Sequence, residues 1–156
     1  MPLSCEDSAM IEIRKAIASD VAAVADVFMA SQADALAFLA KLHTPLEGLA
    51  FIANEVFPQC EVWVALDGTA IVGMMALNGT HLDHLYLQPG FYRRGIGTIL
   101  LDQAKRLSPH SLTLFAFQVN ARACAFYEHH GFVATEYGDG SGNEAREPDV
   151  LYEWKP

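Results

Sequence analysis

The sequence predicts an α/β fold in which one mixed β-sheet of about six to seven strands carries helices on both faces. The length of 156 residues suits a single domain with a substantial core. Apolar residues alternate with polar ones in several short segments, as in strands, and recur at helical spacing in the segments between them. The resulting order is strand, two helices, three strands, helix, strand, helix and two strands. Such an order packs helices against a sheet.

The first half of the chain provides one strand, two helical regions and a hairpin. Residues 1–9 are polar and predict a loose tail, which leaves 10–156 as the single domain. Side-chain caps, a proline and a turn-forming Asp-Gly pair set the boundaries. The expected elements are a strand at 11–14, a helix capped by Ser19 or Asp20, a helical region at about 34–55 interrupted near Pro45, and strands at 61–66 and 69–77.

The second half alternates strands with helices. The stretch 111–118 is apolar on both faces, which is typical of an internal strand. Glycine is favoured just after a helix because it adopts a left-handed conformation without strain. The expected elements are a central strand at 81–87, a helix after Gly95, a strand at 111–118, a helix from Asn120 to Gly131, and strands at 132–137 and 150–154.

Composition and charge limit the classes of function that the chain can have. The net charge of −9 opposes nucleic-acid binding, which needs a basic face, and mildly favours a cationic substrate. No apolar run is long enough to predict a membrane-spanning helix. The three cysteines form no CxxC motif or Cys/His cluster, so we expect neither a disulfide nor a zinc site, and a reducing cytoplasm. His129 and His130 are adjacent, point about 100° apart on a helix, and therefore predict no metal site.

A short loop between the central strand and the next helix carries the clearest chemistry. Arg93, Arg94, Gly95 and Gly97 lie where the helix begins. A helix N-terminus binds anions through its unpaired N–H groups, and glycines allow a close approach to the backbone. A dinucleotide-binding motif would need a third glycine where this chain has Leu100, and the Gly-Lys-Ser/Thr of a P-loop is absent. A diphosphate site of the kind that coenzyme A needs remains.

Two blocks carry a resemblance to a known family. The stretch QPGFYRRGIGTILL (88–101) resembles the pyrophosphate-binding motif of the GNAT N-acetyltransferase superfamily, and NARACAFYEHHGF (120–132) resembles its second acetyl-CoA motif. Their order and separation also match, and the likeness extends over about 10–154. Members usually have Gln or Arg three residues before the first glycine, where this chain has Tyr92. Arg93 or backbone N–H groups are expected to take over that contact.

The resemblance implies transfer of an acetyl group from acetyl-CoA to a primary amine by direct attack in a ternary complex. It places Tyr127 as the acid that protonates the departing sulfur, although a half-buried core tyrosine is the structural alternative. It also implies that the N–H of Leu87 holds the acetyl carbonyl at a bulge in its strand. The implied cofactor-binding residues are Leu85, Leu87, Tyr92, Arg93, Arg94, Gly95, Ile96, Gly97, Thr98, Asn120 and Tyr127.

A base must take a proton from the acceptor, because an alkylammonium ion has no free lone pair. Strict alternation places His81, Asp83, Leu85 and Leu87 on one face of the central strand, and Leu82, His84 and Tyr86 on the other. Family members often carry a Glu or His at positions that match His81 and Asp83. An imidazole titrates near neutral pH, so His81 is the first candidate for the base and Asp83 the second. A surface position or a purely structural His–Asp pair is the alternative.

The acceptor and the assembly are less constrained. A small-molecule amine and a peptide amine both fit, and the acidic charge favours a small cationic amine. Glu144, Glu147 and Asp149 either attract such a cation or belong to a solvated loop. The resemblance also suggests a homodimer. Two other functions stay open, namely an acetyl-CoA sensor or assembly module without turnover, and a transferase that uses a different acyl-CoA.

Overall fold

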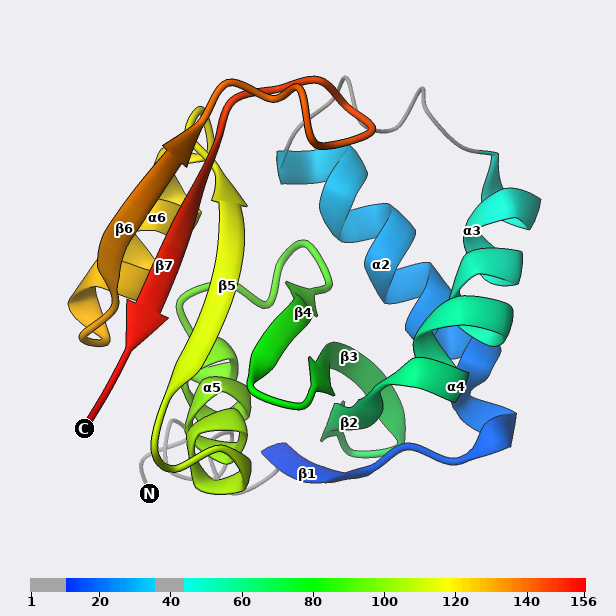
Figure 1. Ribbon diagram of the computed structural model, residues 1–156. Coiled ribbons are helices and arrows are strands. Elements are labelled where there is room, and N and C mark those ends of the chain that lie inside the picture. Colours follow the sequence, from blue (N-terminus) through cyan, green and yellow to red (C-terminus); the bar gives the residue numbers. More distant parts are fainter. Residues whose placement is uncertain (1–10, 36–43) are drawn as a thin grey trace.

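The computed structural model describes residues 11–35 and 44–156, which form one seven-stranded mixed sheet with helices on both faces (Figure 1). The strand order is β1-β2-β3-β4-β5-β7-β6, and every neighbouring pair is antiparallel except β4 and β5. The strands are β1 (Ile11–Lys15), β2 (Glu61–Asp67), β3 (Ala70–Asn78), β4 (His81–Leu87), β5 (Leu112–Phe117), β6 (Val133–Gly138) and β7 (Asp149–Trp154). The predicted fold class and element order are confirmed.

The helices belong to two groups, one on each face of the sheet (Figure 1). They are η1 (Ala18–Asp20), α2 (Val21–Ala35), α3 (Pro45–Phe51), the π-helical η3 (Ile52–Val56), α4 (Phe57–Gln59), α5 (Ile96–Leu107) and α6 (Ala121–His129). The predicted tail at 1–9 and the centre of the predicted helical region at 34–55 lie outside the described residues.

Each face of the sheet has its own apolar core. On one face, Leu100 and Leu101 of α5 are fully buried together with strand residues of β2 to β7. On the other face, Val24 and Val27 of α2 are fully buried against β2 and β3. Both helices present apolar residues at helical spacing, which is why each can bury a single stripe against the sheet. The sheet is thereby fixed between two layers, and its strand ends are held in place.

Pro45 is the first residue of helix α3. Thr44 is the N-cap of α3: its Oγ1 accepts a hydrogen bond from the N–H of Glu47 at 3.2 Å, and its own N–H donates to Glu47 Oε1 at 2.9 Å. Proline is favoured at the first helical position because that N–H has no helical partner. The helical path then continues through η3 and α4 to Gln59. The predicted interruption near Pro45 is present at Thr44, whose extended backbone precedes the new helix.

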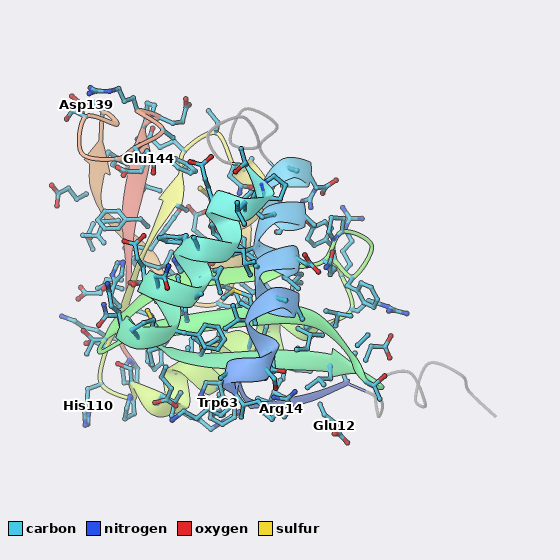
Figure 2. The ribbon with its side chains drawn as sticks, turned by 90° about the vertical axis from the view of Figure 1, so that its right-hand side faces the viewer. Glu12, Arg14, Trp63, His110, Asp139 and Glu144 are labelled. Atoms are coloured by element: carbon cyan, nitrogen blue, oxygen red, sulfur yellow. The ribbon has the colours of Figure 1, made fainter. Side chains whose placement is uncertain are left out.

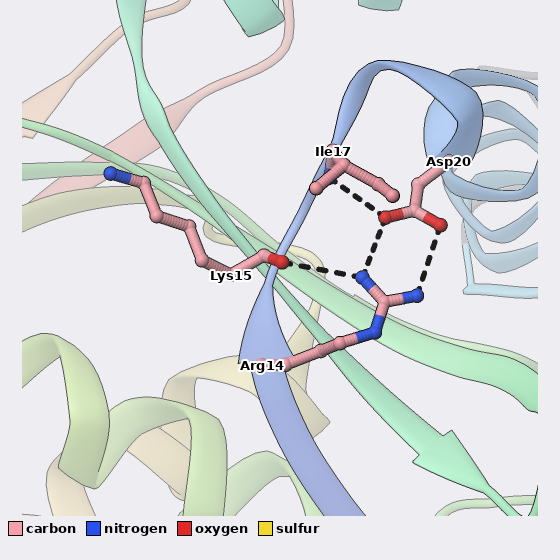
Figure 3. A network of polar contacts seen from close by, with 4 residues as sticks. All are labelled: Arg14, Lys15, Ile17 and Asp20. Atoms are coloured by element: carbon pink, nitrogen blue, oxygen red, sulfur yellow. Dashed lines mark hydrogen bonds and ion pairs between the residues drawn. The ribbon is translucent and has the colours of Figure 1, made fainter.

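Asp20 joins the end of β1 to the start of α2 (Figure 3). One carboxylate oxygen accepts hydrogen bonds from the Ile17 N–H at 2.8 Å and from Arg14 Nη1 at 2.7 Å, and the other accepts from Arg14 Nη2 at 3.1 Å. The helical segment begins at η1 after Ile17, so Asp20 acts from its third position instead of at the predicted cap. The Arg14 guanidinium holds the pKa of Asp20 below its usual value.

We expect Asp20→Ala to lower the free energy of unfolding by about 1–2 kcal/mol, mainly because the Ile17 N–H loses its acceptor. The half-exposed Arg14 adds little to this loss. Because the folded pKa of Asp20 is depressed, its contribution is present above the unfolded carboxyl value and is lost as the pH falls through the folded value. Urea unfolding across this pH range tests the change, with the exposed Glu12→Gln of β1 as the control. A deficit that stayed constant down to strongly acidic pH would contradict this role.

An extra residue in β4 changes the direction of its side chains. Leu82 is paired with Leu77 of β3 and His84 with Ala76, so Asp83 lies between two pairs and has no counterpart on β3. This is a β-bulge, which locally breaks alternation and increases the twist of a strand. Bulges are common beside functional sites, because they redirect side chains.

The bulge corrects two predictions about β4. Strict alternation would place Leu82 with Tyr86, yet Leu82 packs in the α5 core with Leu85 and Leu87, whereas Tyr86 packs in the α2 core. The bulge was also expected at Leu87, where the structure shows regular pairing with Gly73. The irregularity that the resemblance implied is thus present in the strand, but it lies at Asp83.

Candidate active site

The two central strands diverge and leave a cleft between them. β4 and β5 are parallel and in register at His81 and Thr113, and they separate beyond this point (Figure 1). The opening, the β4–β5 cleft, has a volume of about 1010 Å³ and is walled by β4, β5, α2, α6, the start of α5 and the loop between β6 and β7. This volume lies at the upper end of the range for ligand pockets. It can hold a nucleotide-sized molecule and leave room for a second one.

The segment 93–98, here named the α5 turn, forms one wall of the cleft. Gly95 is the N-cap of α5 with a φ of 80°, and Arg93 also has a positive φ, of 64°. The first helical hydrogen bond runs from the N–H of Ile99 to the carbonyl of Gly95 at 3.0 Å. The N–H groups at the start of a helix have no intrahelical acceptor, and they face an incoming anion together with the positive end of the helix dipole. The turn is therefore built to bind an anion.

Its two glycines are required for different reasons. A side chain at Gly95 would meet no atom within 4 Å, so this position needs glycine because of its left-handed backbone. A Cβ at Gly97 would lie 3.3 Å from Cζ of Phe126, so this glycine allows α5 and α6 to approach one another. Thr98 adds a link at the same junction, since its Oγ1 lies 3.2 Å from Nε2 of His130.

Arg122 of α6 lies next to Tyr92, the position at which this chain lacks the Gln or Arg that is usual in the family. Its guanidinium carbon is 4.6 Å from the centre of the Tyr92 ring, and both residues line the cleft. The Tyr92 ring thus holds the Arg122 guanidinium by a cation–π contact, and Arg122 is the polar group. Arg93 also lines the cleft, whereas Arg94 stacks on Phe91 at 5.1 Å. Sequence reasoning missed Arg122, because its partner lies thirty residues away along the chain.

Most of the predicted cofactor-binding residues are brought together. Arg94 and the fully buried Ile96 are not part of the cleft wall. Asn120 also caps α6, since its Oδ1 accepts a hydrogen bond from the N–H of Ala123 at 3.2 Å. The predicted residues that line the cleft are Leu85, Leu87, Tyr92, Arg93, Gly95, Gly97, Thr98, Asn120 and Tyr127.

Tyr127 lies on α6 at the cleft wall with its ring packed among other aromatic rings. The ring centroids of Phe126, Phe132 and Tyr152 lie 5.2, 5.6 and 6.3 Å away. Burial raises the pKa of the Tyr127 hydroxyl far above its usual value, and the nearby Tyr86 and Cys124 act in the same direction. The hydroxyl therefore stays protonated over the physiological range. It can donate a hydrogen bond, and its proton as a bond breaks, to an atom that gains negative charge in the cleft.

His81 and Asp83 are neighbours, but only Asp83 lines the cleft. His81 Nδ1 lies 2.8 Å from Thr113 Oγ1, and its Nε2 lies 3.8 Å from Asp83 Oδ1. The other carboxylate oxygen of Asp83 accepts a hydrogen bond from the Cys60 thiol at 3.5 Å. Burial, followed by the charge of Asp83, raises the pKa of that thiol to about 12, so it stays protonated. The geometry places Asp83 nearer than His81 to anything bound in the cleft.

Several cleft residues were not singled out from the sequence. They come from α2, the bulged strand, α6 with its C-cap, and the β6–β7 loop. They are Ser31, Gln32, His84, Arg122, Phe126, His130, Asp139 and Asn143. The glycine-rich composition of 138–142 predicted a loop but not its place over the cleft. Within 11–35 and 44–156, no three His, Cys, Asp or Glu side chains are grouped as metal ligands. No helix in the same residues is both long and apolar enough to span a bilayer.

Comparison with known proteins identifies the family. The sequence profile described as "Acetyltransferase (GNAT) domain" matches residues 58–134, from the end of α4 into β6. The peptidyl-lysine N-acetyltransferase YiaC of Escherichia coli is 30% identical over 124 residues, which cover 77% of this chain and 82% of YiaC. The chain belongs to the GNAT family of acetyltransferases. The matched residues include the α5 turn and α6.

Further GNAT relatives match in part or at the level of the fold. The peptidyl-lysine N-acetyltransferase YjaB of Salmonella typhimurium is 35% identical over 85 residues, which cover 54% of this chain and only 58% of YjaB. The solution structure of apo YjaB from Escherichia coli superimposes with a TM-score of 0.77 at 24% identity, covering 92% of this chain and 97% of YjaB. The PaiA N-acetyltransferase of Thermoplasma acidophilum, solved with coenzyme A, gives 0.68 at 21% identity, covering 94% and 99%.

Proposed function

We propose that this chain transfers the acetyl group of acetyl-CoA to the primary amine of a lysine side chain in a peptide, by direct attack within a ternary complex. The observation that carries the proposal is the β4–β5 cleft, in which the amide-rich α5 turn and the protonated Tyr127 share one wall. The coenzyme A bound to PaiA supports the donor, and the names of YiaC and YjaB support the acceptor. A peptide lysine thus replaces the small cationic amine that composition favoured.

The α5 turn provides a suitable site for the diphosphate of the donor. The N–H groups of 95–98 at the helix start supply hydrogen-bond donors. Arg93 in the turn and Arg122 on α6 supply positive charge. This local charge contrasts with the net charge of −9 of the whole chain. We expect backbone donors to do most of the binding, because Tyr92 replaces the polar residue that is usual in the family.

Two side chains move protons in the proposed reaction. Acetyl-CoA supplies the acetyl group as a thioester, whose carbonyl carbon forms the new C–N bond while its C–S bond breaks. Asp83 accepts a proton from the amine, directly or through a water molecule, and His81 stabilises the carboxylate from 3.8 Å away. Tyr127 donates its proton to the departing sulfur and is reprotonated, through solvent, by the second proton that the attacking nitrogen loses. The proton balance closes when Asp83 releases its proton.

Acidic residues lie on the acceptor side of the cleft. Asp83 of β4, Asp139 of the β6–β7 loop and Asp149 of β7 all line it. Figure 2 shows Asp139 and Glu144 together in this loop, at the opposite end of the molecule from His110. A negative rim attracts a cationic lysine and raises its local concentration. In this proposal the β6–β7 loop therefore attracts the lysine substrate in addition to connecting two strands.

The donor preference and the cellular compartment follow from two features. Leu85 and Leu87 of β4 narrow the cleft beside α5, which favours an acetyl group over a longer acyl chain.

Cys60 and Cys124 are unpaired thiols, which favours a reducing compartment such as the cytoplasm. A homodimer stays a prediction, and sedimentation velocity tests it directly.

Asp83→Asn is expected to lower kcat by about 100-fold, because an amide cannot accept the proton. His81→Asn should lower kcat by about tenfold or less, since His81 acts on the carboxylate rather than on the amine. Both variants should bind acetyl-CoA like the native chain. Thiol release under saturating peptide measures the two effects. The reverse order of severity would show that His81, the first candidate from the sequence, is the base.

Two measurements test the proposed function. Calorimetric titration with acetyl-CoA should show binding at one site per chain, and longer acyl-CoA molecules should bind or react less well. Release of free thiol should then depend on an N-terminally acetylated peptide with a single lysine, and not on the same peptide with arginine in its place. Binding without turnover on this peptide or on a panel of small amines would instead indicate a sensor. Absence of binding would contradict the proposal entirely.

A further inference from the structure

A histidine that the reaction described above does not use lines the β4–β5 cleft. His84 follows the bulge in β4, and its Nδ1 is shielded from solvent without a hydrogen-bond partner among the described residues. A buried polar atom without a partner costs roughly 1–3 kcal/mol, so such atoms are rare in folded proteins. A bound ligand that satisfies the imidazole would account for its presence.

The packing contacts of His84 do not require a nitrogen in its ring. The rings of Phe28 on α2 and Phe51 on α3 meet the imidazole edge-on with centroids 5.7 Å away, and Tyr86 lies 5.9 Å away. A phenyl ring would make the same edge-to-face contacts without burying a polar atom. Packing alone therefore does not explain a histidine at this position.

The position of His84 assigns it to the acceptor side of the cleft. It lies on the α2 face of the sheet, where its ring contacts Phe28 of α2, and Ser31 and Gln32 of the same helix also line the cleft. The α5 turn and Leu87 lie on the α5 side. A ligand group that reaches His84 while the donor occupies the α5 turn must therefore come from the second substrate.

The charge state of His84 fits contact with an amine. Burial lowers the pKa of its imidazole to about 4, with His81 acting in the same direction and Asp83 opposing it, while Phe28 and Phe51 contribute no charge. The ring is therefore neutral at physiological pH and keeps a lone pair that can accept an N–H.

Resting on the proposed function, we propose that the imidazole of His84 accepts a hydrogen bond from the acceptor amine and positions it beside Asp83. His84 is then a direct substrate contact on the α2 side of the cleft and a determinant of acceptor affinity, whereas Asp83 takes the proton. Both residues lie in the bulged part of β4, and both line the same cleft.

Three substitutions at His84 test this contact. His84→Phe keeps the ring packing and removes both nitrogens. His84→Asn keeps an acceptor near the position of Nδ1, and His84→Gln keeps one near Nε2. We expect His84→Phe to raise KM for the single-lysine peptide about tenfold, with kcat and the dissociation constant of acetyl-CoA unchanged. One of the two amide variants should recover most of the loss. The control is His110→Phe, an exposed position at the far end of the molecule (Figure 2).

Two further readouts keep the inference separate from the proposed function. Thermal melting should show His84→Phe to be at least as stable as the native chain, because an unpaired buried nitrogen is removed. The ¹⁵N resonances of His84 should shift when the peptide is added to the coenzyme A complex. An unchanged peptide KM in an active His84→Phe, or no ¹⁵N shift, would overturn the inference alone. A native chain that binds acetyl-CoA but acetylates no amine would overturn the proposed function.

Discussion

Tyr127→Phe is expected to lower kcat at least about 100-fold while the dissociation constant of acetyl-CoA stays close to the native value. Loss of a general acid typically costs two to four orders of magnitude in rate. The ring of Tyr127 packs against Phe126, Phe132 and Tyr152, and phenylalanine preserves those contacts. Stopped assays of thiol release give kcat, and calorimetry gives the dissociation constant.

The matched control is Tyr137→Phe on β6, because this side chain is 70% exposed and does not line the cleft. It should change neither value. The pH profile gives a second check: burial raises the pKa of Tyr127, so its ionisation should not reduce the rate up to the ordinary tyrosine value near 10. An active Tyr127→Phe variant would show that Tyr127 is only a core tyrosine, which is the alternative given in the sequence analysis.

Gly95→Ala should weaken acetyl-CoA binding at least about tenfold. Gly95 has a φ of 80°, and an alanine in the left-handed region costs roughly 1 kcal/mol or more. The backbone can relieve this strain by rotating, and rotation turns the N–H groups of the α5 turn away from the bound diphosphate. Calorimetry with acetyl-CoA measures the change directly.

Gly79→Ala is a closely matched control for this substitution. Gly79 also has a positive φ, of 64°, and a Cβ there would meet no atom within 4 Å. It lies in the turn between β3 and β4 and does not line the cleft. The two variants should lose similar thermal stability, but only Gly95→Ala should lose affinity. Equal affinities in both would indicate that the α5 turn does not hold the donor.

Local signals were sufficient to predict the element order and the cofactor side of the cleft. Asn120 precedes α6 and caps it with its side chain. Gly131 follows α6 because glycine can adopt the left-handed backbone needed there. Gly95 begins α5 because its backbone is left-handed. These features depend on a few consecutive residues, so a single sequence is enough to recognise them. Pro45 follows the predicted break in the helical region, and proline is favoured at the first position of a helix.

Features that depend on pairing between distant residues could not be predicted. Nothing within 81–87 reveals that Asp83 has no counterpart on β3, since a bulge is a property of two strands. That one residue moves Leu82 into the α5 core. The stacking of Arg122 on Tyr92 likewise needs α6 and the α5 turn to be in place. The acceptor side was therefore the least predictable part of the site.

The most direct test of the account is a crystal structure of the chain with bound acetyl-CoA. We expect the diphosphate oxygens within hydrogen-bonding distance of the N–H groups of 95–98, with the thioester between β4 and β5 next to the Tyr127 hydroxyl. A donor bound elsewhere on the protein, with the α5 turn empty, would contradict the central claim.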